Sequence, residues 1–330
     1  MQQKYFVHIA ILAAALALGV VMLGAYVRLS QAGLGCPDWP GCYGHVTVPT
    51  VQQAAVADAA RPLEATRAWK EMIHRYFAGS LATLILVLAA MAWWQRKQPN
   101  QPLLLPTLLL ALVIFQALLG MWTVTLLLFP PVVMGHLLGG MATFVLLVLL
   151  VLQSGGLLRE GAAASDAMRC FAALGLAVLV CQIALGGWVS SNYAAIACPD
   201  FPVCQGSWWP PMDFASGFSW HGLGIDYQGG ILASPARIAI HVAHRLGAFC
   251  TLLALGGAAS LFLLKGGTRG LRLLGGLVLG LLLLQVALGI SLVEFGWPLP
   301  LADLHNGTAA LLLASAVTLN WAARAGRVKA

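Results

Sequence analysis

Charged side chains are scarce in this sequence. Of its 330 residues only 9% are Asp, Glu, Lys or Arg, whereas 60% are hydrophobic and the mean hydropathy is +0.86. A water-soluble protein could not cover so much apolar surface with so few charges, which excludes an ordinary soluble enzyme. Long apolar runs need lipid as their solvent. The composition therefore predicts a protein with several membrane-spanning segments.

Two further shortages exclude other classes. The basic residues stand singly and lack interleaved aromatic residues, so the net charge of +7 indicates no nucleic-acid surface. Runs such as LATLILVLAAMAWW lack the alternation of polar and apolar residues that strands of a membrane barrel show. Because backbone groups in lipid must be satisfied within their own segment, the spans should be helices. We expect an all-α membrane protein.

Eight apolar segments are long enough to cross a bilayer, which takes roughly 20 helical residues each. They are 7–28, 72–94, 104–127, 132–153, 170–190, 237–264, 273–294 and 302–322. Basic residues collect in one set of connections, at Lys4, Arg96, Lys97, Arg159, Arg169, Lys265, Arg269, Arg272, Arg324, Arg327 and Lys329. By the positive-inside rule these connections and both termini face the cytoplasm of a cell membrane, with the cysteine-bearing loops outside.

The chain also repeats itself. GAYVRLSQAGLGCPDWPGC at 24–42 aligns without a gap with GGWVSSNYAAIACPDFPVC at 186–204, and further motifs recur at offsets of 169 or 170. A near-constant offset indicates a duplication, so we expect two four-helix halves, 1–153 and 170–330, joined by a cytoplasmic linker at 154–169. Since each half has an even number of spans, the two bundles should be related by a pseudo-twofold axis along the membrane normal.

Four histidines occupy equivalent places near the outer ends of the even-numbered spans. They are His74, His136, His244 and His305. Ionisable side chains within a span are costly and mostly functional. Two imidazoles at equal depth on facing helices can ligate one iron from opposite faces of a porphyrin, so the duplication predicts two heme sites. The alternative, a core histidine bonded to a carbonyl group, is weaker for four duplicated positions than for one.

Other metals fit this pattern less well. Zinc needs three or four close nitrogen or sulfur ligands, and each half supplies two histidines. A di-iron site needs several carboxylates, and the spans hold only Glu71, Glu294 and Asp303. Both readings fail on the number of ligands.

The two halves differ beside their histidines. Three residues before the histidine, on the same helix face, stands Glu71 in the first half and His241 in the second. A carboxyl group beside the iron suits proton transfer or stabilisation of a cationic intermediate; the alternative is an interfacial Glu paired with Lys70 or Arg75. Arg75 and Arg245 directly follow the histidines, where a guanidinium can pair with heme propionates or extend to the lipid headgroups.

Taken together, these features resemble the heme A synthase family. The resemblance rests on eight spans in two halves, on EMIHR, HLLGG, HVAHR and HNG in the even-numbered spans, and on the outer cysteine pairs. It covers nearly the whole chain. It implies oxidation of the C8 methyl group of heme O to a formyl group, by successive hydroxylations and loss of water.

The resemblance also implies roles for single residues. His74 and His136 would flank the substrate, heme O, in the first half. His244 and His305 would ligate a heme b for electron transfer in the second half, and Glu71 would be the catalytic carboxylate. Heme O and heme A would be the small-molecule partners, with the heme O synthase and oxidase assembly factors as protein partners. The electron donor and a homo-oligomeric state stay open.

Cysteine pairs bracket the heptapeptides CPDWPGC and CPDFPVC in two predicted outer loops. Outside a bacterial cell the environment is oxidising. A loop shortened by two prolines can bring its Cα atoms to the roughly 4.4–6.8 Å that a disulfide needs. We predict the disulfides Cys36–Cys42 and Cys198–Cys204. They can be static staples over the heme pockets, or the first pair can take part in redox or substrate handover.

Two rival functions stay open at this point. A two-heme electron-transfer cytochrome would hold two permanently bound, chemically identical hemes. A thiol–disulfide oxidoreductase would work through the cysteine pairs and would lose its activity when Cys36 and Cys42 are replaced by serine.

Overall fold

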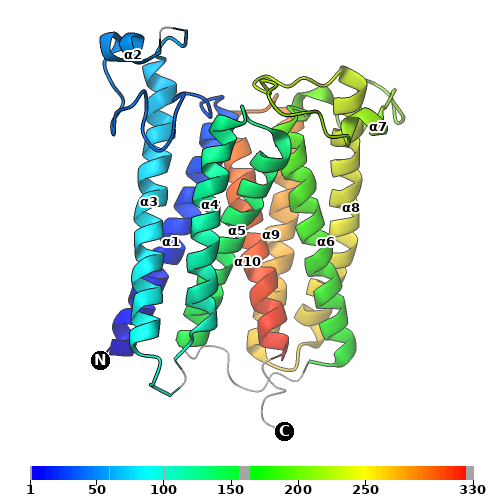
Figure 1. Ribbon diagram of the computed structural model, residues 1–330. Coiled ribbons are helices and arrows are strands. Elements are labelled where there is room, and N and C mark those ends of the chain that lie inside the picture. Colours follow the sequence, from blue (N-terminus) through cyan, green and yellow to red (C-terminus); the bar gives the residue numbers. More distant parts are fainter. Residues whose placement is uncertain (1, 59, 100, 156–163, 325–330) are drawn as a thin grey trace.

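The computed structural model describes residues 2–58, 60–99, 101–155 and 164–324, and the regular structure in these ranges is helical (Figure 1). The long helices are α1 (Gln2–Leu29), α3 (Ala65–Trp94), α4 (Leu104–Thr125), α5 (Pro130–Ser154), α6 (Asp166–Ser191), α8 (Ser234–Lys265), α9 (Arg269–Glu294) and α10 (Leu299–Arg324). The short ones, in loops at one end of the bundle, are α2 (Val51–Ala57), η1 (Ala195–Ala197) and α7 (Phe214–Gly217).

Seven of the long helices are long and apolar enough to cross a membrane, so the chain is an integral membrane protein. They are α1, α3, α4, α5, α6, α8 and α9. The predicted eighth span, α10, is a 26-residue helix that runs alongside them but is not among the seven. It packs against α1, α5, α6 and α9 and carries polar groups that bond within the protein, since the buried Asn320 amide donates to Ala172 O of α6 at 3.0 Å. A helix surrounded by protein needs a less apolar surface than one that faces lipid.

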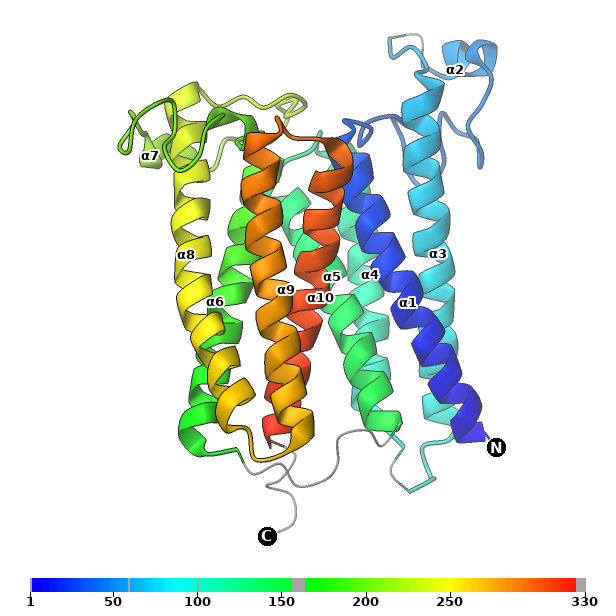
Figure 2. The ribbon, with the colours of Figure 1, turned by 180° about the vertical axis from the view of Figure 1, so that it is seen from behind.

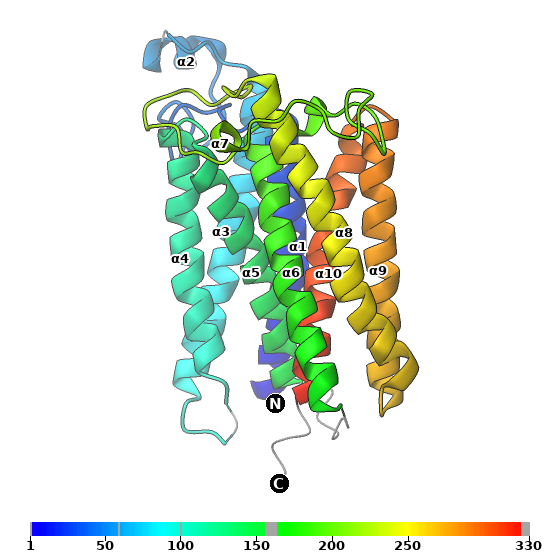
Figure 3. The same ribbon diagram turned by 90° about the vertical axis from the view of Figure 1, so that its right-hand side faces the viewer.

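The helix contacts form two closed circuits. In the first, α1 contacts α3 and α5, and α4 joins α3 to α5; in the second, α6 contacts α8 and α10, and α9 joins α8 to α10. The circuits meet where α5 lies against α6 and α10, and where α1 lies against α10. Figure 2 shows α3 and α8 at opposite edges of the bundle, and Figure 3 shows α4 and α9 at opposite edges in the perpendicular view.

These contacts follow the halves that the repeat predicts, but the division into 1–153 and 170–330 stays a prediction, as does the pseudo-twofold axis. Part of the predicted linker, 156–163, lies outside the described residues, and so do the basic residues Arg159, Arg327 and Lys329. The first residue of α1 and the last of α10 lie at one end of the bundle, and the cysteine loops lie at the other.

Two helices extend further toward the end that carries the cysteine loops than the hydrophobic runs predict. α3 begins at Ala65 and α8 at Ser234, whereas the apolar segments begin at 72 and 237. The additional turn of α3 is polar, and its Arg67 pairs with Glu64 at 3.0 Å. A helix can continue into water once tertiary contacts hold it, so hydropathy alone marks the apolar run and not the helix end.

Candidate functional site

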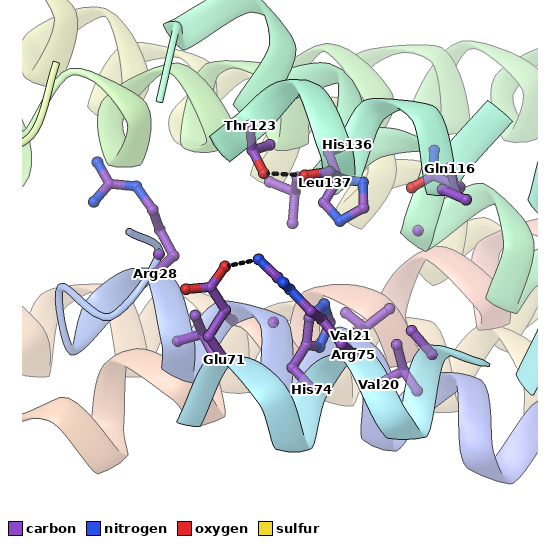
Figure 4. A pocket seen from close by; sticks show the side chains of 18 of the residues that line it. Val20, Val21, Arg28, Glu71, His74, Arg75, Gln116, Thr123, His136 and Leu137 are labelled. Carbon is purple, nitrogen blue, oxygen red and sulfur yellow. Dashed lines mark hydrogen bonds and ion pairs between the residues drawn. The ribbon is translucent and has the colours of Figure 1, made fainter. Parts of the chain in front are cut away.

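A cavity of about 580 Å³ opens within the first circuit, between α1, α3, α4 and α5. Its lining is mostly apolar, and Glu71, His74, Arg75 and His136 are among the polar groups on it (Figure 4). Concave, mostly apolar pockets with a few convergent polar groups are typical of cofactor and ligand sites. The cavity also reaches Ser190 and Asn306, on helices of the second circuit.

His74 of α3 and His136 of α5 face each other across this cavity (Figure 4). Their ring centroids are 6.5 Å apart and the ring planes are nearly perpendicular, at 88°. Two imidazole nitrogens, each about 2 Å from a shared metal, would separate the ring centroids by roughly 6 Å. The Nδ1 atoms of both rings are buried and make no hydrogen bond of ordinary geometry within the described residues. The pair therefore has the spacing of two axial ligands of one iron.

Each of the four predicted histidines rests against a glycine of a neighbouring helix. A Cβ atom added to the glycine would meet the Cε1 atom of the ring: too closely at Gly24, tightly at Gly186 and Gly289, and in ordinary van der Waals contact at Gly120. The pairs are Gly24 with His74 (2.9 Å), Gly120 with His136 (3.5 Å), Gly186 with His244 (3.2 Å) and Gly289 with His305 (3.3 Å). The glycines lie on α1, α4, α6 and α9 and repeat at offsets of 162 and 169. The sequence reasoning missed them, although the repeat marked their positions.

In the second circuit, His244 lies on α8 and His305 on α10, and the Nδ1 atom of His305 is buried without a hydrogen bond within the described residues. Gln182 of α6 packs beside His244: its Nε2 lies 3.1 Å from the ring Nδ1 atom and donates to His244 O at 3.0 Å. The equivalent of Gln182 in the first half is Val20, so the two histidine pairs have different neighbours. Gln182 is a residue that the sequence reasoning did not identify.

Glu71 is buried beside the first histidine pair, with 4% of its surface exposed. One carboxylate oxygen accepts a hydrogen bond from the Cys36 N–H group at 2.9 Å, and the other pairs with Arg75. In the second half the same position holds His241, which is also buried. Its ring meets that of Trp297 edge-on, with the ring centroids 5.7 Å apart. The asymmetry that the sequence shows is thus an asymmetry of buried groups beside the two sites.

Arg75 and Arg245, predicted as propionate contacts, both bind the cysteine loops. Arg75 donates to Gly41 O and to Pro40 O, the latter at 3.1 Å. Arg245 donates to Val203 O and Asp200 O, each at 2.8 Å. Both guanidinium groups therefore tie a loop to the helix that carries a histidine, and their pairing with heme propionates stays a prediction.

Both predicted disulfides are present. The Cα atoms of Cys36 and Cys42 are 4.9 Å apart, and those of Cys198 and Cys204 are 4.7 Å apart. Each disulfide closes the loop beside one histidine pair, at the N-terminal end of α3 or α8.

An aspartate inside each disulfide loop is a further feature that the sequence reasoning missed. Asp38 accepts from the N–H groups of Tyr43 and Gly44, both at 2.6 Å, and Asp200 accepts from Gln205 at 2.6 Å and Gly206 at 2.7 Å. The Gly206 N–H group, together with that of Gln205, holds the pKa of Asp200 below its ordinary value. The sequence feature that could have revealed them is the Asp that CPDWPGC and CPDFPVC share at their third position.

Comparison with known proteins places this arrangement in a family. The model of the COX15-CtaA family, described as cytochrome oxidase assembly protein, matches residues 7–317. The chain belongs to the COX15-CtaA family. A heme A synthase of Shewanella oneidensis is 45% identical over 315 residues, which cover 92% of each chain.

More distant relatives in the COX15-CtaA family cover a similar length. A heme A synthase of Halalkalibacterium halodurans is 27% identical over 87% of this chain and 86% of its own. Another, of Rhizorhabdus wittichii, is 26% identical over 94% of this chain and 91% of its own. The family that the sequence resembles is therefore the family to which it belongs, and the relatives support an enzyme of heme A biosynthesis.

Proposed function

We propose that this protein is a heme A synthase that oxidises the C8 methyl group of heme O to a formyl group in the cavity of the first circuit. The observation that carries the proposal is the pair His74 and His136. They face each other across that cavity with their ring centroids 6.5 Å apart. The buried carboxylate of Glu71 lies on the same cavity, which a purely electron-transferring site would not need.

The cavity fits an iron porphyrin as substrate. Its volume of about 580 Å³ lies within the usual range for ligand pockets, roughly 300–1,000 Å³. Its apolar walls suit a tetrapyrrole with a farnesyl-type tail, and its two imidazoles suit the metal. We propose that His74 and His136 hold the substrate by its iron and so keep the ring within the cavity that Glu71 lines.

A resident heme b in the second circuit is the other part of the proposal. His244 and His305 are supported as its ligands because each rests on a glycine in the same way as the first pair. When bound, a bis-histidine heme supplies one-electron transfer. In this chain α8 and α10 would hold it, and α10 also contacts α1 and α5 of the first circuit.

Glu71 would move protons during the reaction. In each of the two hydroxylations O2 would supply one oxygen atom to the methyl carbon, while two electrons and two protons reduce the other oxygen atom to water. Loss of water from the resulting diol then leaves the formyl group, so protons are taken up and released beside the methyl group. The Cys36 N–H group and Arg75 hold the carboxylate of Glu71 in one orientation on the cavity wall. A positioned carboxylate of this kind contributes as a general acid or base. Heme O would be supplied by the synthase that farnesylates heme, and oxidase assembly factors would receive heme A.

The proposed arrangement in the membrane has eight spans, in two four-helix bundles, within the cell membrane. Both ends of the chain would lie in the cytoplasm and the disulfide loops outside. Supporting this are the two closed circuits of helix contacts and the position of α10 inside the bundle.

Heme extraction with mass spectrometry tests the function. The purified protein should yield heme b together with heme O, its alcohol intermediate or heme A. H244A or H305A should remove the absorbance of the heme b in the second circuit and leave heme O bound. H74A should lose heme O and keep the absorbance of heme b. H8A, which changes an exposed histidine of α1, should change neither. Two chemically identical hemes and no product would instead support the electron-transfer cytochrome.

A further inference from the structure

Arg28 is a second basic residue on the wall of the first cavity, and the proposed reaction has not yet given it a role. It lies in the last turn of α1, one turn beyond Gly24, the glycine that supports the His74 ring. In Figure 4 it stands on the opposite side of Glu71 from the two histidines. Its Nη2 atom donates to Ser190 O at 2.6 Å, and its guanidinium carbon lies 4.1 Å from the centre of the Tyr193 ring.

The charge of Arg28 lacks an acidic partner among the described residues. No carboxylate in the described part of the chain forms an ion pair with it, and its Nε atom is buried without a hydrogen bond. Arg75, the other basic residue on the cavity wall, is already paired with Glu71. A partly buried cation that carbonyl groups and an aromatic ring balance only in part is favoured when an anion joins it.

We propose that Arg28 is the anion-binding residue of the first cavity and receives a carboxylate of the bound tetrapyrrole. The proposal rests on the proposed function, which places an iron porphyrin between His74 and His136. One helical turn separates Gly24 from Arg28, a rise of about 6 Å along α1. The propionate groups of a porphyrin extend several ångströms beyond the ring edge, so one directed outward reaches the level of Arg28. Charge-assisted pairing of guanidinium with carboxylate is among the stronger hydrogen-bonded contacts in proteins.

The repeat supports a role confined to the first cavity. The equivalent of Arg28 in the second half is Ser190, which is the residue whose carbonyl Arg28 binds, 162 positions away. The second site therefore has no cation at this position. Arg28 thus makes the substrate site selective for a charged porphyrin edge, in a way that the resident site does not share.

A purely structural reading of Arg28 gives a different expectation. Its contacts with Ser190 O and Ser191 O also bridge α1 to the C-terminal end of α6, where a cation is favourable. If this bridge were its whole function, replacing it would weaken binding of every porphyrin to the first cavity by the same factor.

The two readings separate when the ligand is changed as well as the protein. Iron mesoporphyrin and its dimethyl ester, which lacks the carboxylate charges, are titrated against the purified protein with the second site filled. H74A defines the signal of the first site. For each protein the Kd of the ester is divided by the Kd of the free acid. We expect this ratio to be at least tenfold larger in the wild type than in R28Q. R28K, which keeps the charge, should retain most of this preference, and R67Q, on the polar outer turn of α3, should retain all of it.

Each outcome bears on the proposal. If R28Q weakens both ligands equally, or if the wild type itself prefers neither ligand, Arg28 is a bridge between helices and the proposal is wrong. Should R28Q fail to fold, the wild-type preference and its retention in R28K still decide. If the wild type binds neither porphyrin in the first cavity, the proposed function fails independently of Arg28.

Discussion

Glu71 is the residue at which the outer loop, α3 and the cavity meet. Its carboxylate takes one hydrogen bond from the backbone of Cys36, inside the disulfide loop, and one contact from Arg75, a turn further along its own helix. Arg75 in turn binds carbonyl groups of the same loop. The orientation of the carboxylate therefore depends on the loop as well as on the helix, and the disulfide contributes by holding that loop closed.

Replacing Glu71 removes the proposed proton carrier but leaves both histidine pairs intact. We expect E71A and E71Q to retain heme in both sites and to lose heme A formation by a factor of about 100 or more, because a positioned acid or base contributes roughly 10²–10⁴ in rate. Heme content by absorbance and product by mass spectrometry measure the two effects separately. E64Q, which removes only the exposed partner of Arg67, is the matched control. Normal turnover by E71A would contradict the assignment.

Among the helices, α1, α4, α6 and α9 each contribute a glycine that leaves room for a histidine of the adjacent helix. Small residues allow helices in lipid to approach closely, and here the space is taken by an imidazole ring. The ring is thereby held between its own helix and the backbone of the next. This explains how two imidazoles can be fixed at a metal-binding separation without a hydrogen bond of ordinary geometry at Nδ1 of His74 or His136.

Adding a methyl group at these glycines should displace the rings. We expect G24A to lower binding of heme O in the first site and G289A to lower heme b in the second, each by severalfold and without affecting the other site. G19A on α1 and G280A on α9 are matched controls, because a Cβ atom there would meet nothing within 4 Å. Both controls should be neutral or slightly stabilising, since alanine is the better helix former. If G19A and G280A lost as much heme as G24A and G289A, the effect would be one of general packing and not of the contact between glycine and histidine.

The two disulfide loops are the same small unit used twice. Each combines a disulfide, an aspartate that binds two backbone N–H groups and an arginine from the following helix. The unit closes one end of a bundle by combining side chain to backbone bonds with a small hydrophobic cluster around each disulfide. Among the described residues, the first loop also binds a carboxylate, that of Glu71, which adds a contact on the proposed substrate side.

For the whole molecule, α10 decides the topology. Seven spans would place the two ends of the chain on opposite sides of the membrane, and eight would place them on the same side. In Figure 1 the start of α1 and the end of α10 lie at the same end of the bundle. The contacts of α10 with α1, α5, α6 and α9 give it a central place, where its polar residues face protein.

Reporter fusions test this topology. Green fluorescent protein, which matures in the cytoplasm, should fluoresce when fused at either end of the chain, whereas alkaline phosphatase should be inactive at both. Phosphatase inserted after residue 232, in the loop before α8, should be active and serves as the control. Phosphatase activity at the C-terminal fusion alone would mean that α10 does not cross the membrane.

The sequence by itself determined the membrane class, seven of the eight spans that it predicted, the duplicated loops with their disulfides, and the family. Each of these depends on local chemistry: apolar run length, the spacing of cysteines, or motifs at a constant offset. The four histidines and Glu71 could be named for the same reason, because an ionisable group in an apolar run is conspicuous wherever its side chain points.

Only the tertiary structure decided what these groups contact. The loop carbonyl groups that Arg75 and Arg245 bind were not predicted, and neither was the place of Arg28 on the cavity wall without an acidic partner among the described residues. The glycine supports and the place of α10 inside the bundle also depend on which helices become neighbours. The physical reason is that a contact between segments more than a hundred residues apart is set by the packing of the whole bundle, which no local pattern records.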